Sequence, residues 1–395
     1  MKYLIEYLPR IDCIQVQIED DVDSVILKGL TPQEMVIECM RNNNTTHKLQ
    51  QLNIELPQVV LAVVEKNLKF IRHSKYMWSL RLKLYPKKNL SHKISTLWGS
   101  YDILLDSKLN KWNKKHLKSL KDFQFICDCC KFIILDSDTN CQRLNEMPSD
   151  NWVELMDYWH CHKPDTPIEY IDSSKQDLPA FSSSRYSTLK PYTNEVLISG
   201  STFHTLLGTI KDKIEAIRQE GKTILRCIKC SNVLGERTAS NNICKLYKWK
   251  LNLQCKQSNE LDCYPPQNDV ILKIWNYVTN YSRRYILLKC KDRKDLLIWI
   301  FALDIGVTLT DNVVYPNSVK ILYVNGDNNE DYNTTKQGKR PKDCNNKNKT
   351  MNVEEIDVSE LPYEKFLAQL NNNNQLLPNA AQVFNKWRIS YLPLT

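Results

Sequence analysis

Glycine is scarce in this chain, which contains nine glycines in 395 residues. Neither GxGxxG nor GxxxxGK[ST] occurs, so the sequence predicts no glycine-rich loop of the kind that binds nucleotide phosphates. HExxH and G-x-S-x-G are missing too, which disfavours a hydrolytic metal centre and a serine nucleophile. We therefore assign no catalytic residue.

Long apolar runs are also lacking. The most apolar stretch, residues 296–309, is shorter than the roughly 20 residues that cross a bilayer, and it contains Asp304. Glu6 and Pro9 interrupt the apolar core that a signal peptide would need. We expect a soluble intracellular protein that does not associate with membranes.

The charge is basic but dispersed. The net charge is +9 and the hydrophobic content is 42%, enough for a substantial core. Such a balance weakly favours acidic partners. The basic residues are scattered apart from short stretches at 114–116 and 339–342, which disfavours direct nucleic-acid binding. An RNA-binding module remains an alternative that steep salt dependence would reveal.

The chain contains 14 cysteines, and two pairs have the C-x-x-C spacing: Cys127 with Cys130, and Cys227 with Cys230. This spacing lets a tight turn direct two thiolates to one tetrahedral ion, and reduced intracellular cysteines favour a metal over disulfides. Four thiolates would leave no open position, so we predict one structural zinc. The alternative is two unrelated pairs of buried thiols, because 227 − 130 = 97 residues separate the pairs.

Other nearby ligands keep the zinc assignment open. Cys129 could replace Cys130, although the spacing favours Cys130. Cys161 and His162 could join Cys127 and Cys130 in a rival Cys3His site. Because two adjacent residues rarely bind the same ion, one of these two could instead interact with a metal ligand without binding the ion itself.

Hydrophobic periodicity predicts a mixed α+β protein in three regions: a β-rich domain at 1–120, a zinc-stabilised centre at 121–260 and an α/β domain at 261–395 with a disordered insert at 325–352. Alternating apolar residues predict strands around 14–18 and 78–84, and a hairpin is predicted at 126–135. Helices are predicted at 151–159, 206–218, 270–281 and 363–370, the second ended by Gly221. Residues 163–194 are expected to form an extended connection, and strands are expected at 245–253 and 383–392.

The order of motifs resembles the HECT-like ubiquitin-conjugating-enzyme-binding family. It runs through Cys127-x-x-Cys130, Pro148-Ser149-x-Asn151-Trp152-x-Glu154-Leu155, Trp159-x-Cys161-His162 and Cys227-x-x-Cys230 with Leu234-Gly235-Glu236. The terminal VFNKWRISYL is similar to that family's end, and the fungal members linked to pre-mRNA 3′-end processing are the most similar. The second pair also resembles a knuckle of β-tent proteins of the Yippee type, which close one zinc with two distant knuckles.

The resemblance implies two functions. The first is regulation of the metallo-β-lactamase endonuclease of the mRNA cleavage and polyadenylation machinery, with a cysteine loop entering the nuclease active site. Cys141 fits this role, with Asn140 and Arg143 bonding the surrounding carboxylates, because a thiolate is a strong zinc ligand. The alternative for Cys141 is an exposed cysteine without a role. This function implies a place in the nucleus and cytoplasm.

The second implied function is ubiquitin ligation, by binding a charged ubiquitin-conjugating enzyme around the second knuckle. A thioester mechanism needs an accessible, activated cysteine. Cys344 is the C-terminal candidate, but it lies in the low-complexity run and has no neighbouring histidine. Adaptor-type ligation is therefore the form that we expect if this function holds.

Overall fold

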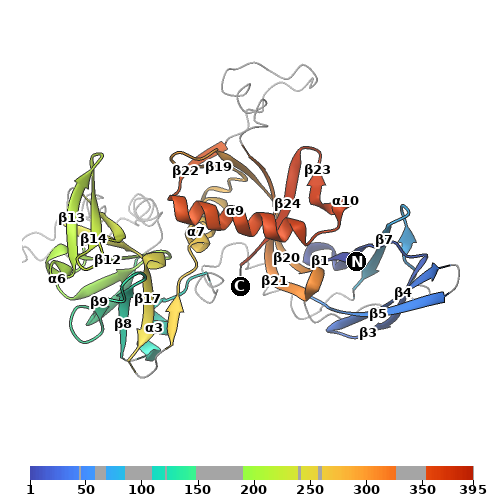
Figure 1. Ribbon diagram of the computed structural model, residues 1–395, viewed down its shortest axis with the longest axis horizontal. Helices are drawn as coiled ribbons and strands as arrows, with labels where there is room; N and C mark the ends of the chain where they lie inside the picture. The colour runs from blue at the N-terminus through green and yellow to red at the C-terminus, as the bar shows by residue number, and fades with distance from the viewer. Residues whose placement is uncertain are drawn as a thin grey trace, which may run out of the picture. The chain divides into compact units, whose positions relative to one another are not determined.

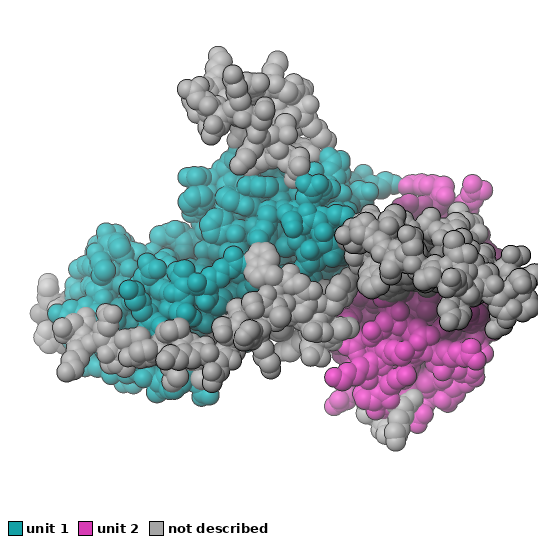
Figure 2. Space-filling view, turned by 180° about the vertical axis from the view of Figure 1, so that it is seen from behind, with its two compact units in different colours: residues 1–109, 267–395 teal, residues 110–266 magenta. Residues whose placement is uncertain are grey.

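A computed structural model describes residues 1–43, 46–57, 68–84, 109–120, 122–147, 190–238, 242–256, 260–325 and 353–394. The chain forms two compact units, the first made of residues 1–109 and 267–395 and the second of residues 110–266 (Figures 1 and 2). The structure therefore divides the chain differently from the three predicted domains. The two ends of the sequence share one unit because their strands pair in one sheet.

Unit 1 contains most of the strands. Its elements are β1 (Lys2–Leu8), η1 (Pro9–Ile11), β2 (Cys13–Glu19), β3 (Ser24–Leu30), β4 (Glu34–Asn43), β5 (Thr46–Glu55), β6 (Ile71–Arg72), β7 (Met77–Lys83), α7 (Gln267–Tyr281), β19 (Tyr285–Lys289), β20 (Leu296–Leu309), η4 (Thr310–Asn312), β21 (Val313–Asn325), β22 (Val353–Asp357), α9 (Glu360–Gln375), α10 (Asn379–Gln382), β23 (Val383–Phe384) and β24 (Trp387–Pro393).

The large sheet of unit 1 runs β23-β24-β21-β20-β1-β2-β7-β6, and β19 and β22 extend it beside β20. The predicted alternation in β2 and β7 is confirmed: Val16 and Leu80 are buried partners in register. Their apolar face packs on a second sheet of order β3-β4-β5, through residues such as Ile37 and Ile54. A strand with one buried face needs such a partner layer.

Helices α7 and α9 bury their apolar sides against β19, β20 and β21, as Ile274, Phe366 and Ile298 show (Figure 1). Both helices were predicted. The asparagine-rich end of α9 is structural: Asn373 Nδ2 donates to Tyr391 O at 2.7 Å, and Asn374 Nδ2 donates to the carbonyls of Gln382, just before β23, and Ile389, in β24. These amides satisfy carbonyls that burial removes from water.

Unit 2 contains two further sheets. Its elements are α3 (Lys114–Leu120), β8 (Phe123–Cys127), β9 (Ile133–Asp136), β10 (Arg143–Glu146), β11 (Glu195–Ile198), β12 (Thr202–Leu206), α6 (Leu207–Ile210), β13 (Ile214–Gln219), β14 (Lys222–Cys227), β15 (Val233–Arg237), β16 (Ile243–Tyr247), η3 (Lys248–Lys250), β17 (Leu251–Cys255) and β18 (Leu261–Cys263). The sheet orders are β10-β11-β12-β16-β15-β14-β13 and β18-β17-β8-β9.

An aromatic cluster fills the core of unit 2. Trp112 is fully buried and its ring stacks on that of Phe203, with centroids 6.4 Å apart. Phe125 lies 4.6 Å from Phe203, and Tyr264 lies 5.6 Å from Trp112. Trp112 precedes α3, Phe125 and Phe203 lie on strands of the two sheets, and Tyr264 follows β18. Because these rings contact one another, they join the two sheets into one core.

The helix predicted at 206–218 is wrong. Only α6 is helical there, and Ile214 begins strand β13, which pairs with β14 from Ile214↔Cys227 to Gln219↔Lys222. Gly221 has φ +79 and turns this hairpin instead of ending a helix. Cross-strand pairing overrides the helical spacing of a short segment. The helix predicted at 151–159 lies outside the described residues, as do residues 163–189 of the connection predicted at 163–194 and nearly all of the predicted insert at 325–352.

The described helices include none that is long and apolar enough to cross a membrane.

Candidate metal centre

Two hairpins with the same backbone carry the cysteine pairs. In the first, Cys127 ends β8 and Cys130 precedes β9; in the second, Cys227 ends β14 and Cys230 precedes β15. The N–H of Cys127 donates to Phe132 O at 2.8 Å, and the N–H of Cys227 donates to Asn232 O at 2.8 Å. Equivalent positions therefore differ by 100 in number.

The equivalence extends to local backbone detail. The residue after each second cysteine is left-handed, Lys131 with φ 59 and Ser231 with φ 56. Each hairpin has a register shift just before its first cysteine, between Phe125 and Ile126 and between Leu225 and Arg226. A left-handed residue after a tight turn lets both cysteine side chains point to one side.

The neighbouring strands repeat the pattern as well. The N–H of Asp128 donates to Lys250 O, just before β17, and the N–H of Ile228 donates to Lys213 O, just before β13, both at 3.2 Å. Each knuckle is thus held by its own hairpin and by a third strand. Rigid support of this kind places the thiols before any ion arrives.

The four sulfur atoms form a compact group. Cys127 Sγ lies 3.7 Å from Cys230 Sγ, Cys130 Sγ lies 3.6 Å from Cys227 Sγ, and all four lie within 4.8 Å of one another. A disulfide would need about 2.05 Å. A tetrahedral ion with bonds of about 2.3 Å places its ligands about 3.8 Å apart. The spacing therefore fits one tetrahedral metal ion held by all four cysteines, a donor set typical of zinc or of iron–sulfur sites.

Burial raises the pKa of Cys227 to about 12, and hydrogen bonds from backbone N–H groups partly oppose the shift. Without a cation, such a thiol stays protonated at neutral pH. A divalent ion reverses this balance because it stabilises the thiolates directly.

Asn232 links the two knuckles. It follows Ser231 in the second hairpin, but its Nδ2 donates to Asp128 Oδ1 at 2.5 Å and lies 3.9 Å from Cys127 Sγ in the first. A donor to a ligating sulfur reduces its charge and fixes its direction. Sequence reasoning missed this residue, because only the fold brings position 232 to position 128.

The surface around the knuckles is basic and partly apolar. The Phe132 ring has Lys229 Nζ 4.6 Å and Lys213 Nζ 5.4 Å from its centroid. Ile228, at the tip of the second knuckle, is 55% exposed, whereas the equivalent residue of the first knuckle is Asp128. The two knuckles therefore share a backbone and differ in the side chain that they present.

Comparison with known proteins assigns the chain to a family. The model of the family described as HECT-like Ubiquitin-conjugating enzyme (E2)-binding matches residues 6–389, which include parts of both units. The chain belongs to this HECT-like E2-binding family. An uncharacterized protein of Saccharomyces cerevisiae is 36% identical over 398 residues, covering 100% of this chain and 99% of the relative. No solved structure matches the chain.

In this HECT-like protein, one of the alternative zinc ligands can be placed. Cys129 is exposed and is not part of the four-sulfur group. Cys161 and His162 lie outside the described residues, so the rival Cys3His site stays a prediction. The four cysteines favoured from their spacing are the ones that the fold brings together.

The loop that carries Cys141 differs from expectation. The sequence predicts an exposed loop, but Cys141 is 3% exposed and Asn140 is 6% exposed. Arg143 is exposed and starts β10. Burial also raises the pKa of Cys141, with a further contribution from Asp136. The expected exposure is therefore wrong for two of the three residues, and the nuclease role of the loop stays a prediction.

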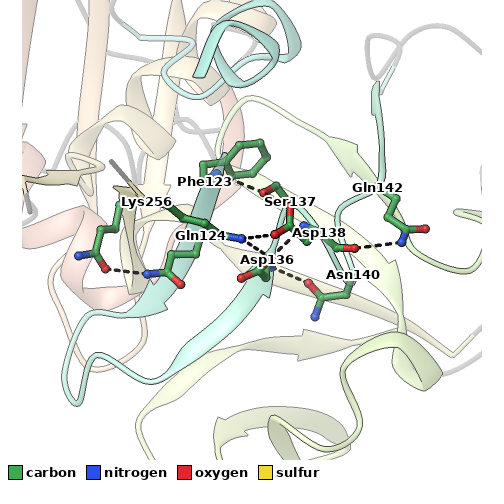
Figure 3. A network of polar contacts seen from close by, with 9 residues as sticks. Phe123, Gln124, Asp136, Ser137, Asp138, Asn140, Gln142 and Lys256 are labelled. Atoms are coloured by element: carbon green, nitrogen blue, oxygen red, sulfur yellow. Dashed lines mark hydrogen bonds and ion pairs between the residues drawn. The ribbon is translucent and has the colours of Figure 1, made fainter. Parts of the chain in front are cut away.

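The polar residues of this loop bind one another, which explains the burial (Figure 3). The carbonyl of Asp136 accepts the N–H groups of Asn140 at 3.1 Å and Cys141 at 2.9 Å. The Asn140 amide accepts from Asp136 N and donates to Ile134 O. Lys256 Nζ bonds the carboxylates of Asp136 at 3.0 Å and Asp138 at 2.6 Å. Asn and Asp side chains satisfy nearby backbone groups, so a polar sequence can form a closed turn.

Lys248 is a charged residue in the core of unit 2. It is fully buried, and its Nζ donates to Lys111 O at 2.9 Å and to Gly200 O at 3.0 Å, beside the Phe203 ring. Burial lowers its pKa to about 7. Its contacts join three segments of unit 2, so we assign it a structural part in the scaffold.

Proposed function

We propose that this HECT-like protein binds a ubiquitin-conjugating enzyme through the second knuckle and presents the charged enzyme to a substrate. The family match over residues 6–389 carries this proposal, because the family is defined by such binding. The match spans nearly the whole chain rather than one motif. The assigned role is that of a binding scaffold in ubiquitin transfer.

Ile228 is the docking residue that the geometry favours. It is 55% exposed, yet its N–H is fixed to Lys213 O and its neighbours Cys227 and Cys230 belong to the sulfur group. An apolar side chain on a rigid loop loses little entropy on binding and can fill a pocket on a partner. Lys229 and Lys213 place positive charge beside it, which suits a partner with acidic residues around an apolar pocket.

Zinc is the ion that we assign to the sulfur group, in a structural role. Four cysteine ligands leave no position for water, so the ion would hold the two knuckles together and perform no hydrolysis. In this role the metal supports the function indirectly, because it sets the position of the Ile228 loop.

Four buried cysteines are unsuited to thioester catalysis. A thioester nucleophile needs an accessible thiol with a lowered pKa. Burial raises the pKa of Cys39, Cys141, Cys244 and Cys290 instead. We therefore expect ubiquitin to pass from the conjugating enzyme to the substrate without a covalent intermediate on these thiols.

Binding of purified ubiquitin-conjugating enzymes to the full chain, measured by biolayer interferometry, tests the proposal. We expect Ile228→Ala to weaken binding by roughly tenfold or more, since a central apolar anchor contributes at least ~1.4 kcal/mol. Ile71→Ala is the matched control, because Ile71 is 63% exposed in unit 1. Ubiquitin discharge from the charged enzyme to free lysine should fall in parallel.

Two results would contradict the proposal. Equal binding by wild type and Ile228→Ala would remove the second knuckle as the docking site. A reducible ubiquitin adduct on this chain, seen on a non-reducing gel, would replace scaffolding by thioester catalysis.

The endonuclease prediction remains a rival function. Co-purification of the nuclease with wild type but not with Cys141→Ala would favour it, although the loop would first have to expose a buried thiol.

A further inference from the structure

Unit 1 has an interruption in its large sheet. One edge of β20 pairs with β19 over residues 296–299 and with β1 over residues 306–309, while β21 pairs along the other edge. Residues 301–305 lie between these two partners, and the described strands leave this length of edge uncovered. Backbone groups on such an edge are available to a bound chain.

The backbone of β20 is irregular at the same place. Its register with β21 shifts three times between Ile300 and Val307, and Asp304 is left-handed with φ 59. Bulges and left-handed residues that are not glycine cost free energy and concentrate at binding sites. This is a second reason to look for a ligand here.

A pocket of about 260 Å³ opens at the interruption. Leu8, Pro9, Trp299 and Phe301 give it an apolar lining, and Phe301 is 49% exposed. The Trp299 ring is fixed, because it stacks on Tyr285 with centroids 5.5 Å apart. An apolar pocket with a rigid aromatic wall suits a single apolar side chain.

Two arginines complete the lining. Arg10 follows β1 and Arg284 precedes β19, so each comes from one border of the interruption. Both arginines lower the pKa of the Asp304 carboxyl, but burial has the larger effect, so this pKa is raised overall. The repulsion of Arg10 adds to burial in lowering the pKa of Arg284. Both arginines line the pocket and Asp304 does not, so the pocket presents positive charge, which favours an anion.

We propose that this pocket binds the C-terminal end of a peptide chain, with an apolar last side chain against Trp299 and Phe301 and the terminal carboxylate at Arg10 and Arg284. Guanidinium groups bind carboxylates through paired hydrogen bonds. A chain passing through the interruption would collide with β1 or β19, which occupy its two borders. A chain end needs only one entrance and can still bond the open edge.

The site would recruit substrates in unit 1, while the second knuckle of unit 2 holds the conjugating enzyme. This use of the pocket rests on the proposed function, whereas peptide binding itself does not.

Ligand-observed NMR on the full chain tests the site with three probes. The first is acetyl-Gly-Gly-Ser-Gly-Leu with a free carboxylate, the second is its amide, and the third is the amide of acetyl-Gly-Gly-Ser-Glu-Leu. We expect the free acid to bind roughly tenfold or more tightly than either amide, because only the free acid has a carboxylate on its last residue. The third probe has its carboxylate on the glutamate side chain that precedes the last residue. Arg284→Gln and Arg10→Gln should each reduce the affinity for the free acid to the affinity measured for its amide.

Arg41→Gln is the matched control, since Arg41 forms a surface ion pair with Asp20 in the same unit. It should bind the free acid like wild type, and circular dichroism of every variant shows whether it is folded. Absence of binding by the wild type, equal binding of acid and amide, or equal binding of the internal glutamate peptide would each overturn the proposal. Conjugating-enzyme binding by Arg284→Gln should remain unchanged, which separates failure of this site from failure of the proposed function.

Discussion

Removing one cysteine from either knuckle should release the metal to the same extent. Cys127→Ser and Cys227→Ser occupy equivalent places in two hairpins of the same backbone, and each contributes to a close sulfur pair of 3.7 Å or 3.6 Å. If the four cysteines hold one ion, loss of Cys127 and loss of Cys227 must both weaken binding of that same ion. Two unrelated pairs of thiols would give two independent results.

The magnitude follows from the number of ligands. Structural zinc in small domains contributes roughly 10–16 kcal/mol of apparent binding free energy, or about 3 kcal/mol for each of four ligands. Loss of one ligand should therefore weaken zinc binding by about two orders of magnitude. Because an ion held by all four cysteines would join the sheet of β8 to the sheet of β14, unit 2 should lose stability as well.

Zinc content by mass spectrometry and competition with a chromogenic chelator measure this effect. Wild type should hold about one zinc per chain, and both variants should lose it at the same chelator concentration. Cys141→Ser is the control, because Cys141 is buried in the same unit but outside the sulfur group. Two zinc ions per chain, or loss in only one of the two variants, would refute a shared site.

Three further predictions concern stability. Burial, and to a smaller extent Lys245, lowers the pKa of His204 to about 4. Neutral His204 should therefore contribute about 3 kcal/mol to the free energy of unfolding above pH ~6.5, and this contribution is lost as the pH falls toward ~4. Chemical denaturation of His204→Gln at pH 7.5 and 4.5 should lack this part of the pH dependence. Gly235→Ala should destabilise by more than ~2 kcal/mol, because its Cβ would lie 2.0 Å from a backbone carbonyl, whereas Gly208→Ala meets nothing within 4 Å and should be nearly neutral in the same melts. Glu6→Gln should cost about 1.5–3 kcal/mol in chemical denaturation, since buried Glu6 pairs with half-buried Lys320 at 2.9 Å; a loss below ~1 kcal/mol would show that the pair is solvated.

Local patterns predicted several elements well, and the reasons are physical. Alternation identified β2 and β7 because each has one buried face, and helical spacing identified α7 and α9 because each lies on a sheet. The same spacing failed at 206–218, where pairing of β13 with β14 decided the structure. Short segments depend on their partners more than on their own periodicity.

The sequence also identified the four cysteines that the fold groups together, because a C-x-x-C turn directs two thiols to one side whatever surrounds it. The sequence could not show that two hairpins 97 residues apart lie together. Their positions depend on the tertiary structure, in which the first knuckle is bonded to the residue before β17 and the second to the residue before β13. Nor could it show that Cys141 is buried, since the polar residues around it bind one another instead of water. The interruption in β20 likewise exists only because β1 and β19, from opposite ends of the chain, cover different parts of one edge. Chemistry carried by adjacent residues is therefore readable from the sequence, whereas exposure and long-range neighbours depend on the tertiary structure.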